Sequence, residues 1–460
     1  MGGRTIVSPT PAATAPVVLP PLARPKPAFY LAIAFVFVVY ARFPEILDAF
    51  IGTGLHSARI LLMLSLLATL LAGTLIRVAF SKIGFCMLAF TAWMCLSIPF
   101  SIWRGGSFNV LRDQWLFSIF SFLIVAAAVQ GLEQCRRIMY SLAAATVFIE
   151  FCSAVLGRVR YGRAEVLVGT LGNANFLAMM LLMGLPFCLF VIGSKPGFSL
   201  LKIACVITAV AAPITIVATG SRGGLLTMLF MFLLYFFRLP ASQKILAVVA
   251  ALALGLIAVG RSNQGALERY KTLMGTSETN PQLSMDERSA MESSQSRRVL
   301  LWNSVRMTFE HPLLGVGVGM FQVANARAEE AAGHASWSNW FETHNAFTEI
   351  SSEMGLPAII LFGAAIYLSF RITRLARRQA RRNDAYASFE APAFALRLSL
   401  YAYLGFALFT SIAYLYYFPL LAGLCVALER SLLEAGGADV ATAPASAGPA
   451  APAGRRAMTR

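Results

Sequence analysis

Hydrophobic segments follow one another along most of this chain, and short polar segments separate them. Each is close in length to the roughly 20 helical residues that cross the ~30 Å hydrocarbon core of a bilayer. The segments are too long for the strands of a membrane barrel and do not alternate apolar and polar residues as those strands do. The pattern predicts an all-α polytopic membrane protein with about twelve transmembrane helices, at residues 28–43, 60–77, 83–100, 115–130, 138–156, 174–192, 201–218, 222–238, 244–260, 355–372, 393–412 and 413–430.

Basic residues give these helices an orientation. The formal net charge is +16, which on a soluble protein would indicate nucleic-acid binding. Here the basic residues gather in loops on one side of the predicted membrane, and residues 371–384 alone contain six arginines and one acid. The positive-inside rule places that side in the cytoplasm, and the even number of helices places both termini there. We therefore expect membrane lipids, and no nucleic acid, as partners.

One connection on the outer side is far longer than the others. Residues 261–354 carry helical patterning and three of the four histidines, His311, His334 and His344. A connection of this length is usually functional or disordered. The predicted organisation is a disordered cytoplasmic N-terminus (1–27), nine transmembrane helices (28–260), a periplasmic loop that carries the active site (261–354), three more transmembrane helices (355–430) and a disordered cytoplasmic tail (431–460).

The segment TGSRGG, residues 219–224, places an arginine at the outer edge of the membrane. The apolar run after it, from Leu225 to Phe237, is too short to cross a bilayer, so the helix must begin near Arg222. The helix N-terminus and the flanking glycines would let an anion such as a diphosphate approach the backbone. An interfacial arginine that reaches up to lipid phosphate is an equally good interpretation.

A helix is predicted after Ser296, which can cap its start, and Pro312 prevents it from continuing far. Arg298 extends its apolar stripe, whereas Arg297 is rotated by about 100° from that stripe. An arginine on a buried face needs an anionic partner. Either a structural ion pair with a nearby glutamate or a substrate phosphate satisfies this requirement. The residues that form the stripe are Leu301, Trp302, Val305 and Phe309.

The segment THN, residues 343–345, precedes the next apolar helix on the same outer face. A lone histidine is more often structural than catalytic, but His344 shares its face with both unusual arginines. A neutral imidazole can accept a proton near neutral pH, so His344 is a candidate general base. Asn345 beside it is a weaker site candidate.

A basic segment, GRVRYGRAE (157–165), lies on the outer side against the positive-inside rule. An anionic partner such as a sugar-phosphate lipid or a contact with the membrane surface would each explain it. Its three arginines are weaker site candidates: Arg158, Arg160 and Arg163.

Motifs of several other chemistries are absent from the outer loops. They contain no Asp-x-Asp, no His/Asp cluster with metal-ligand spacing, no Gly-x-Ser-x-Gly and no P-loop. Arginines would therefore carry the charge neutralisation that a divalent metal performs elsewhere. We expect neither a metal nor another cofactor.

Four segments together resemble the O-antigen ligase/polymerase superfamily, over about residues 160 to 360. Where this chain has Asn173-Ala174-Asn175, the family often has NPN, which weakens Asn175 as a site residue. The segments are GTLGNANFLAMMLLMGLP (169–186), TGSRGG, RVLLWNSVRMTFEHPLLGVGVGMF and THNAFTEI.

The resemblance implies a metal-independent, inverting, GT-C-like glycosyltransferase of lipopolysaccharide biosynthesis in the Gram-negative inner membrane. Its donor would be undecaprenyl-diphosphate-linked O-antigen, and the acceptor of a ligase would be lipid A–core. Arg222 and Arg298 match the two arginines of the family that contact the diphosphate, and His344 matches its essential histidine.

Three alternatives to the ligase remain open from the sequence. A protein O-oligosaccharyltransferase ranks below the polymerase, because these enzymes usually carry a large C-terminal soluble region and only about thirty low-complexity residues follow the last predicted span. An O-antigen polymerase would use the same donor with a lipid-linked acceptor. A transporter or flippase of anionic lipids would also place arginines in the membrane, but it predicts broken helices and inverted repeats, which the sequence does not display.

Overall fold

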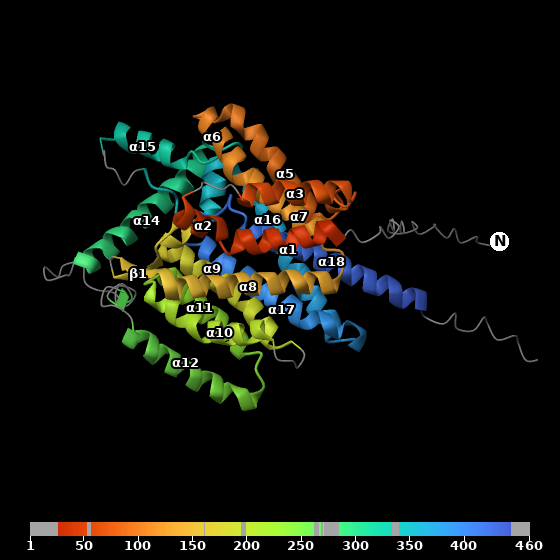
Figure 1. The fold of residues 1–460 in the computed structure, drawn as a ribbon. Helices are drawn as coiled ribbons and strands as arrows, with labels where there is room; N and C mark the ends of the chain where they lie inside the picture. Colours follow the sequence, from red (N-terminus) through yellow and green to blue (C-terminus); the bar gives the residue numbers. More distant parts are fainter. Residues whose placement is uncertain are drawn as a thin grey trace, which may run out of the picture.

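The computed structural model describes residues 26–52, 57–160, 162–194, 199–261, 266–267, 270, 285–333 and 340–442. Within these ranges the chain is almost entirely helical, and one short hairpin interrupts the helices (Figure 1). The predicted disordered segments fall mostly outside the described residues, as does His334. However, the last helix continues to Thr442, so the start of the predicted disordered tail is helical.

The first third of the chain, as far as Leu156, is helical wherever it has regular structure among the described residues. Its long helices each cover a predicted apolar segment, and a 65° bend separates the first two. The elements are α1 (Lys26–Tyr40), α2 (Phe43–Ile51), α3 (Ser57–Leu71), α4 (Ile76–Ala79), α5 (Lys82–Ser97), η1 (Ile98–Phe100), α6 (Arg104–Val110), η2 (Leu111–Trp115), α7 (Leu116–Ala128) and α8 (Leu132–Leu156).

The rest of the chain, from Gly157 onward, contains the hairpin and the remaining helices. The hairpin pairs its two strands antiparallel, with Arg158 opposite Glu165. The elements are β1 (Gly157–Arg160), β2 (Arg163–Val166), η3 (Gly169–Gly172), α9 (Ala174–Ile192), α10 (Leu200–Ala218), α11 (Arg222–Phe236), α12 (Ala241–Arg261), α14 (Met285–Glu310), α15 (Phe321–Ala331), α16 (Ala346–Ala380), η6 (Asp384–Phe389), α17 (Glu390–Ala407) and α18 (Tyr417–Thr442).

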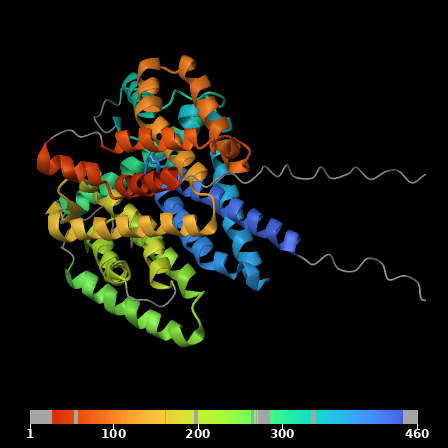
Figure 2. The same cartoon turned by 45° about the vertical axis from the view of Figure 1, so that its right-hand side comes forward.

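The core lies around α9, which packs against α8, α10 and α17. By contrast, α12 lies at the edge of the bundle in both views (Figures 1 and 2). In its most apolar stretch only 6% of the residues are buried. Large apolar side chains that face outward, such as Ile245 and Leu256 on α12, are the expected lipid-facing surface of a membrane protein.

Every predicted span falls on a helix of the structure, and the chain is a polytopic all-α membrane protein. Among the described residues, seven helices are long and apolar enough to cross a membrane, or eight if the bent pair α1–α2 counts as one span. Two shorter apolar helices, α3 and α11, add to these. Twelve spans therefore remain a prediction.

Helix α14 corrects two expectations. It begins at Met285, so Ser296 lies inside the helix and does not cap it, although the helix does end before Pro312. The predicted apolar stripe also faces outward: Trp302 is 70% exposed and Phe309 is 73% exposed.

The buried face of α14 is mixed: the polar residues Asn303, Ser304 and Thr308 lie on it together with Leu300 and Met307. This face packs on α16, and the hydroxyls of Thr308 and Ser351 are 2.8 Å apart. The amphipathic pattern was therefore assigned to the wrong face.

Helix α16 starts nine residues before its predicted span and changes direction once. Gly355 has φ 76° and ψ −176°, outside helical geometry, and Pro357 follows it. A Cβ on Gly355 would lie 2.2 Å from the carbonyl oxygen of Leu313, so only glycine fits. The break separates a short outer segment, which begins at Asn345, from the long membrane helix.

Candidate active site

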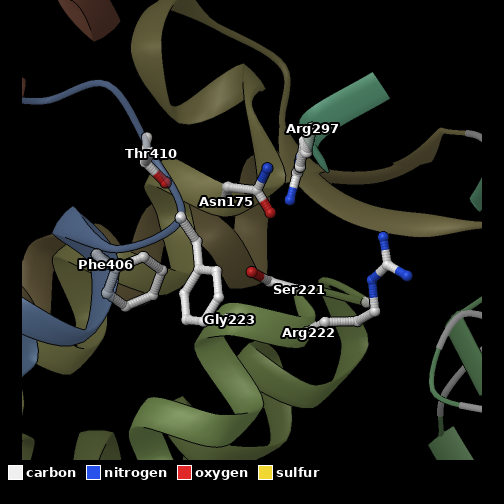
Figure 3. A pocket seen from close by; sticks show the side chains of 9 residues that line it. Asn175, Ser221, Arg222, Gly223, Arg297, Phe406 and Thr410 are labelled. Carbon is white, nitrogen blue, oxygen red and sulfur yellow. The ribbon is translucent and has the colours of Figure 1, made fainter. Parts of the chain in front are cut away.

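A narrow pocket opens at one end of the bundle, where four helices meet (Figure 3). The starts of α9 and α11, the middle of α14 and the end of α17 contribute to it. This end is opposite the first residues of α1 and the last residues of α18 (Figures 1 and 2). The lining residues are Asn175, Gly220, Ser221, Arg222, Gly223, Arg297, Phe406, Phe409 and Thr410.

The start of α11 gives the pocket its floor. Ser221 caps this helix, and its hydroxyl accepts a hydrogen bond from the backbone N–H of Gly224 at 3.2 Å. Gly220 adopts φ 62°, which turns the chain from α10 into the cap. The positive end of the helix dipole and the guanidinium of Arg222 therefore lie at the same place. As predicted, α11 begins at Arg222.

Arg297, and not Arg298, reaches this pocket from α14. Figure 3 shows its side chain descending toward the amide of Asn175, with Arg222 rising beside it from the start of α11. Arg298 lies on the exposed side of α14 and does not line the pocket. This follows because the apolar stripe of α14 faces outward. Arg298 lies on that stripe, whereas Arg297 is rotated from it by about 100° and therefore points inward.

Asn175 is held in the pocket by an arginine of the hairpin. Asn173 is the cap of α9, so Asn175 is free of that role. Arg163 donates one hydrogen bond to Asn175 Oδ1 at 2.8 Å and another to the carbonyl oxygen of Thr219, also at 2.8 Å. Arg163 thereby joins β2, the start of α9 and the end of α10. Because Oδ1 is engaged, the amide NH₂ of Asn175 is oriented as a donor.

The other two arginines of the hairpin do not line the pocket. Arg158 pairs with Glu165 across the strands at 3.0 Å, and its side chain is 42% exposed. Arg160 is exposed at the end of β1. Arg163 is therefore the arginine of this segment that we connect with the pocket, through its hydrogen bond to Asn175.

His344 lies beside the pocket, just before α16. Its backbone has φ 53°, which is uncommon for a residue other than glycine, and its N–H donates to Ser411 Oγ at 3.0 Å. Burial, and secondly the positive charge of Arg297, lower the pKa of His344 from 6.5 to about 4. The imidazole is therefore neutral at pH 7, and it lies within electrostatic reach of the pocket arginine.

Asn345 has a structural task. Its side-chain oxygen accepts hydrogen bonds from the N–H groups of Phe347 and Thr348, which caps α16. Its amide nitrogen donates to the carbonyl oxygen of Leu408 at 3.2 Å. Asn345 thus fixes the start of α16 to the end of α17, and with it the backbone of His344.

Glu353 is a buried carboxylate that the sequence did not single out. It accepts hydrogen bonds from the N–H of Gly319 at 2.6 Å and of Phe321 at 3.1 Å, and from the hydroxyl of Tyr414 at 2.6 Å. The glycine-rich loop of residues 315–319 is therefore bound to the protein's own carboxylate. The same contacts position the 411–417 connection, which carries Ser411.

Sequence reasoning also missed the far wall of the pocket. Phe406, Phe409 and Thr410 come from the end of α17 and the residues after it, more than 180 residues from Arg222. No local motif marks them. Within the described ranges, no group of three or more His, Cys, Asp or Glu side chains could hold a metal ion.

These features define a class: a multi-pass, all-α membrane protein with a basic pocket at one end of its helix bundle and a neutral histidine beside it. A family model described as O-antigen ligase matches residues 203–363. The match supports the assignment of this chain to the O-antigen ligase family. A search of curated proteins found no match.

The family indicates a glycosyltransferase-like ligase or polymerase of lipopolysaccharide biosynthesis, with polysaccharide and lipid substrates. The matched segment includes Arg222, Arg297 and His344, whereas Arg163 and Asn175 lie outside it.

Proposed function

We propose that this protein is an O-antigen ligase. It transfers O-antigen polysaccharide from undecaprenyl diphosphate to lipid A–core in the periplasmic leaflet of the Gram-negative inner membrane. One observation carries the proposal: Arg222 and Arg297 line the same pocket, and the charge of Arg297 reaches His344.

The two arginines bind the diphosphate of the donor. Guanidinium groups form charge-assisted hydrogen bonds with phosphate oxygens, and the start of α11 adds backbone N–H groups to the same anion. Asn175 presents its amide to the same space, since Arg163 occupies its oxygen. Together these groups stabilise the negative charge that develops on the leaving diphosphate.

His344 acts as the general base. It takes the proton from an acceptor sugar hydroxyl while that oxygen attacks the anomeric carbon of the donor. The bond from the anomeric carbon to the diphosphate oxygen breaks, and its electron pair leaves with the diphosphate. Because the displacement is direct, the configuration at that carbon inverts. Loss of a general base typically costs 10²- to 10⁴-fold in rate.

Donor binding also tunes this base. In the free enzyme the pKa of His344 is about 4, partly because Arg297 is positive. A bound diphosphate offsets the charge of Arg297, so the pKa of His344 rises and the imidazole becomes a stronger base. The base is thus most basic when the donor is in place.

The remaining features of the proposal concern topology and metals. Both termini lie in the cytoplasm, and about twelve helices cross the inner membrane in a GT-C-like arrangement. The pocket lies at the opposite end of the bundle from α1's first residues, so it opens to the periplasm. The arginines neutralise the diphosphate without a metal, as the absence of Asp-x-Asp motifs from the outer loops suggests.

A deletion strain analysed by lipopolysaccharide gel electrophoresis tests the reaction. A strain without the ligase makes core with no O-antigen and accumulates long lipid-linked polymer. Core that still receives single repeat units would indicate a polymerase instead. Unchanged lipopolysaccharide together with loss of anionic-lipid transport would indicate a flippase.

An in-vitro ligation assay with purified protein tests the chemistry. A His344→Ala variant that ligates near the wild-type rate would remove the general base from the mechanism. Activity that is lost in EDTA and restored by Mg²⁺ would contradict the metal-independent step.

A further inference from the structure

A second pocket lies between α11 and α17, two of the helices that line the candidate active site, at the end of this pair that is farther from that site. Helices α11 and α17 run antiparallel, so the end of α11 and the start of α17 meet about 20 Å from the candidate active site, given the 1.5 Å rise of each of the 15 residues of α11. The end of α16 closes this second pocket. Its lining residues are Leu234, Phe237, Arg238, Arg377, Arg381, Phe394, Arg397, Leu398 and Tyr401.

Four of these residues are arginines, and a single carboxylate serves them. Glu390 forms ion pairs with Arg238, with Arg377 at 3.4 Å and with Arg381 at 3.5 Å. Arg397 instead donates to the hydroxyl of Tyr401 at 3.1 Å. The cluster therefore carries a formal excess of three positive charges. Like charges gathered in one partly buried place repel one another, and a bound anion relieves that repulsion.

Two of the guanidinium groups are held by a shared aromatic ring. Those of Arg238 and Arg377 lie over the ring of Phe394, with centroid distances of 4.0 Å and 4.6 Å. The side chain of Arg377 is 17% exposed, and its Nε atom is buried without a hydrogen-bond partner among the described residues.

The rest of the pocket is apolar. Leu234, Phe237 and Leu398 line it next to the arginines. Phe237, directly after α11, is 69% exposed and so faces the surroundings of the bundle, whereas Leu398 is buried. A ligand that fits both halves carries a phosphate and a hydrocarbon tail, which describes a phospholipid better than a free phosphate ion. Basic pockets between membrane helices are known to take anionic headgroups.

We propose that this pocket, formed by the ends of α11 and α16 and the start of α17, binds the phosphate headgroup of an anionic membrane lipid. The lipid occupies the leaflet opposite the candidate active site. It holds together three helices, of which α11 carries Arg222 and α17 leads to Phe406 and Phe409 at the other end. The proposal does not depend on the identity of the reaction.

The test measures lipid binding to the purified, delipidated full chain by native mass spectrometry. The probes are phosphatidylglycerol, zwitterionic phosphatidylcholine and inorganic phosphate. The variant is Arg381→Gln with Arg397→Gln, because Arg381 is 62% exposed and Arg397 has no ion pair with Glu390, which limits the damage to packing. The matched control is Arg374→Gln with Arg378→Gln, two exposed arginines of α16 outside the pocket.

We expect preferential binding of phosphatidylglycerol to the wild type. Each pocket arginine should contribute about fivefold to the affinity for phosphatidylglycerol. The double substitution in the pocket should therefore lower this affinity about 25-fold, whereas the control double substitution should change it less than about threefold. Equal losses in both pairs would mean unspecific charge attraction and would overturn the proposal. Displacement by inorganic phosphate alone, or no preference over phosphatidylcholine, would overturn it as well.

Thermal unfolding without added lipid controls for folding of the variants. If the double variant unfolds, Arg381→Gln alone is compared with Arg378→Gln, with an expected difference of about fivefold. No difference between these single variants would again reject the site.

Discussion

The arginines at the two ends of the α11–α17 pair have different neighbouring groups. At the candidate active site, Arg222 and Arg297 share a pocket with hydroxyl and amide groups, and no carboxylate is among its described lining residues. At the opposite end, three of four arginines form ion pairs with Glu390, and two of these three lie over the ring of Phe394. In the second arrangement, Glu390 already offsets part of the positive charge of the arginines.

This difference indicates which of the two pockets is suited to catalysis. Only the candidate active site has a group that is neutral and basic near its arginines, namely His344. The opposite end has no histidine among its lining residues, and its single acid pairs with arginines. The first end is therefore suited to displacement of a diphosphate, and the second to holding a lipid in place. The following predictions test this contrast.

The largest effect is expected from loss of the base. His344→Ala should lower the rate of in-vitro ligation 10²- to 10⁴-fold, because the proposed acceptor of the hydroxyl proton is lost. Binding of the lipid-diphosphate donor should be nearly unchanged. The matched control is His311→Ala, since His311 is exposed at the end of α14. Equal losses in the two variants would contradict the assignment.

The next effect separates two adjacent arginines. Arg297→Ala should lower the ligation rate about 10²- to 10³-fold, because it removes a donor to the charge that develops on the leaving group. Arg298→Ala should change the rate less than about threefold, since its side chain points away from the pocket. The single-turnover rate with saturating acceptor measures both. The reverse order of effects would restore Arg298 as the diphosphate ligand.

A smaller effect is expected from the residue that positions Asn175. Arg163→Gln should lower ligation about tenfold, because Asn175 and the carbonyl of Thr219 lose their shared donor and the pocket shifts. The partly exposed pair of Arg158 with Glu165 contributes little, so Arg158→Gln should cost less than about twofold. Comparable losses would show that the hairpin acts through its net charge.

The smallest effect concerns pH. Since the pKa of His344 is lowered to about 4 and the neutral imidazole is the active form, kcat/KM should stay level from pH 7 down to about 5 and fall as pH drops through about 4. In Arg297→Gln the fall of kcat/KM with decreasing pH should occur at a higher pH, because one of the two causes that lower the pKa of His344 is gone. A wild-type acid limb near pH 6.5 would contradict the coupling.

The sequence predicted most of the helices, because apolar length alone marks a membrane span. Helix α9 covers Ala174–Ile192, as predicted, and α11 begins at Arg222 because its apolar run is too short without that residue. The number of spans is less certain from length, since α3 and α11 each have only 15 residues. Bends such as Gly355 leave little trace in hydropathy.

The candidate site was predictable only where a motif is local. Arg222 and His344 lie in short segments with a clear environment, and the structure places both at the same end of the bundle. Arg298 was chosen over Arg297 by the rule that apolar faces are buried, which fails for a helix whose mixed face packs against the protein. The contact of Arg163 with Asn175 depends on the tertiary fold and has no signal in the sequence.

The central claim is that Arg222 and Arg297 hold one diphosphate beside His344. A cryo-electron microscopy structure of His344→Ala with bound undecaprenyl-diphosphate donor tests it most directly. The account predicts phosphate oxygens within hydrogen-bonding distance of both guanidiniums, and the anomeric carbon on the side of residue 344. A diphosphate held by Arg298, or by only one of the two pocket arginines, would contradict the account.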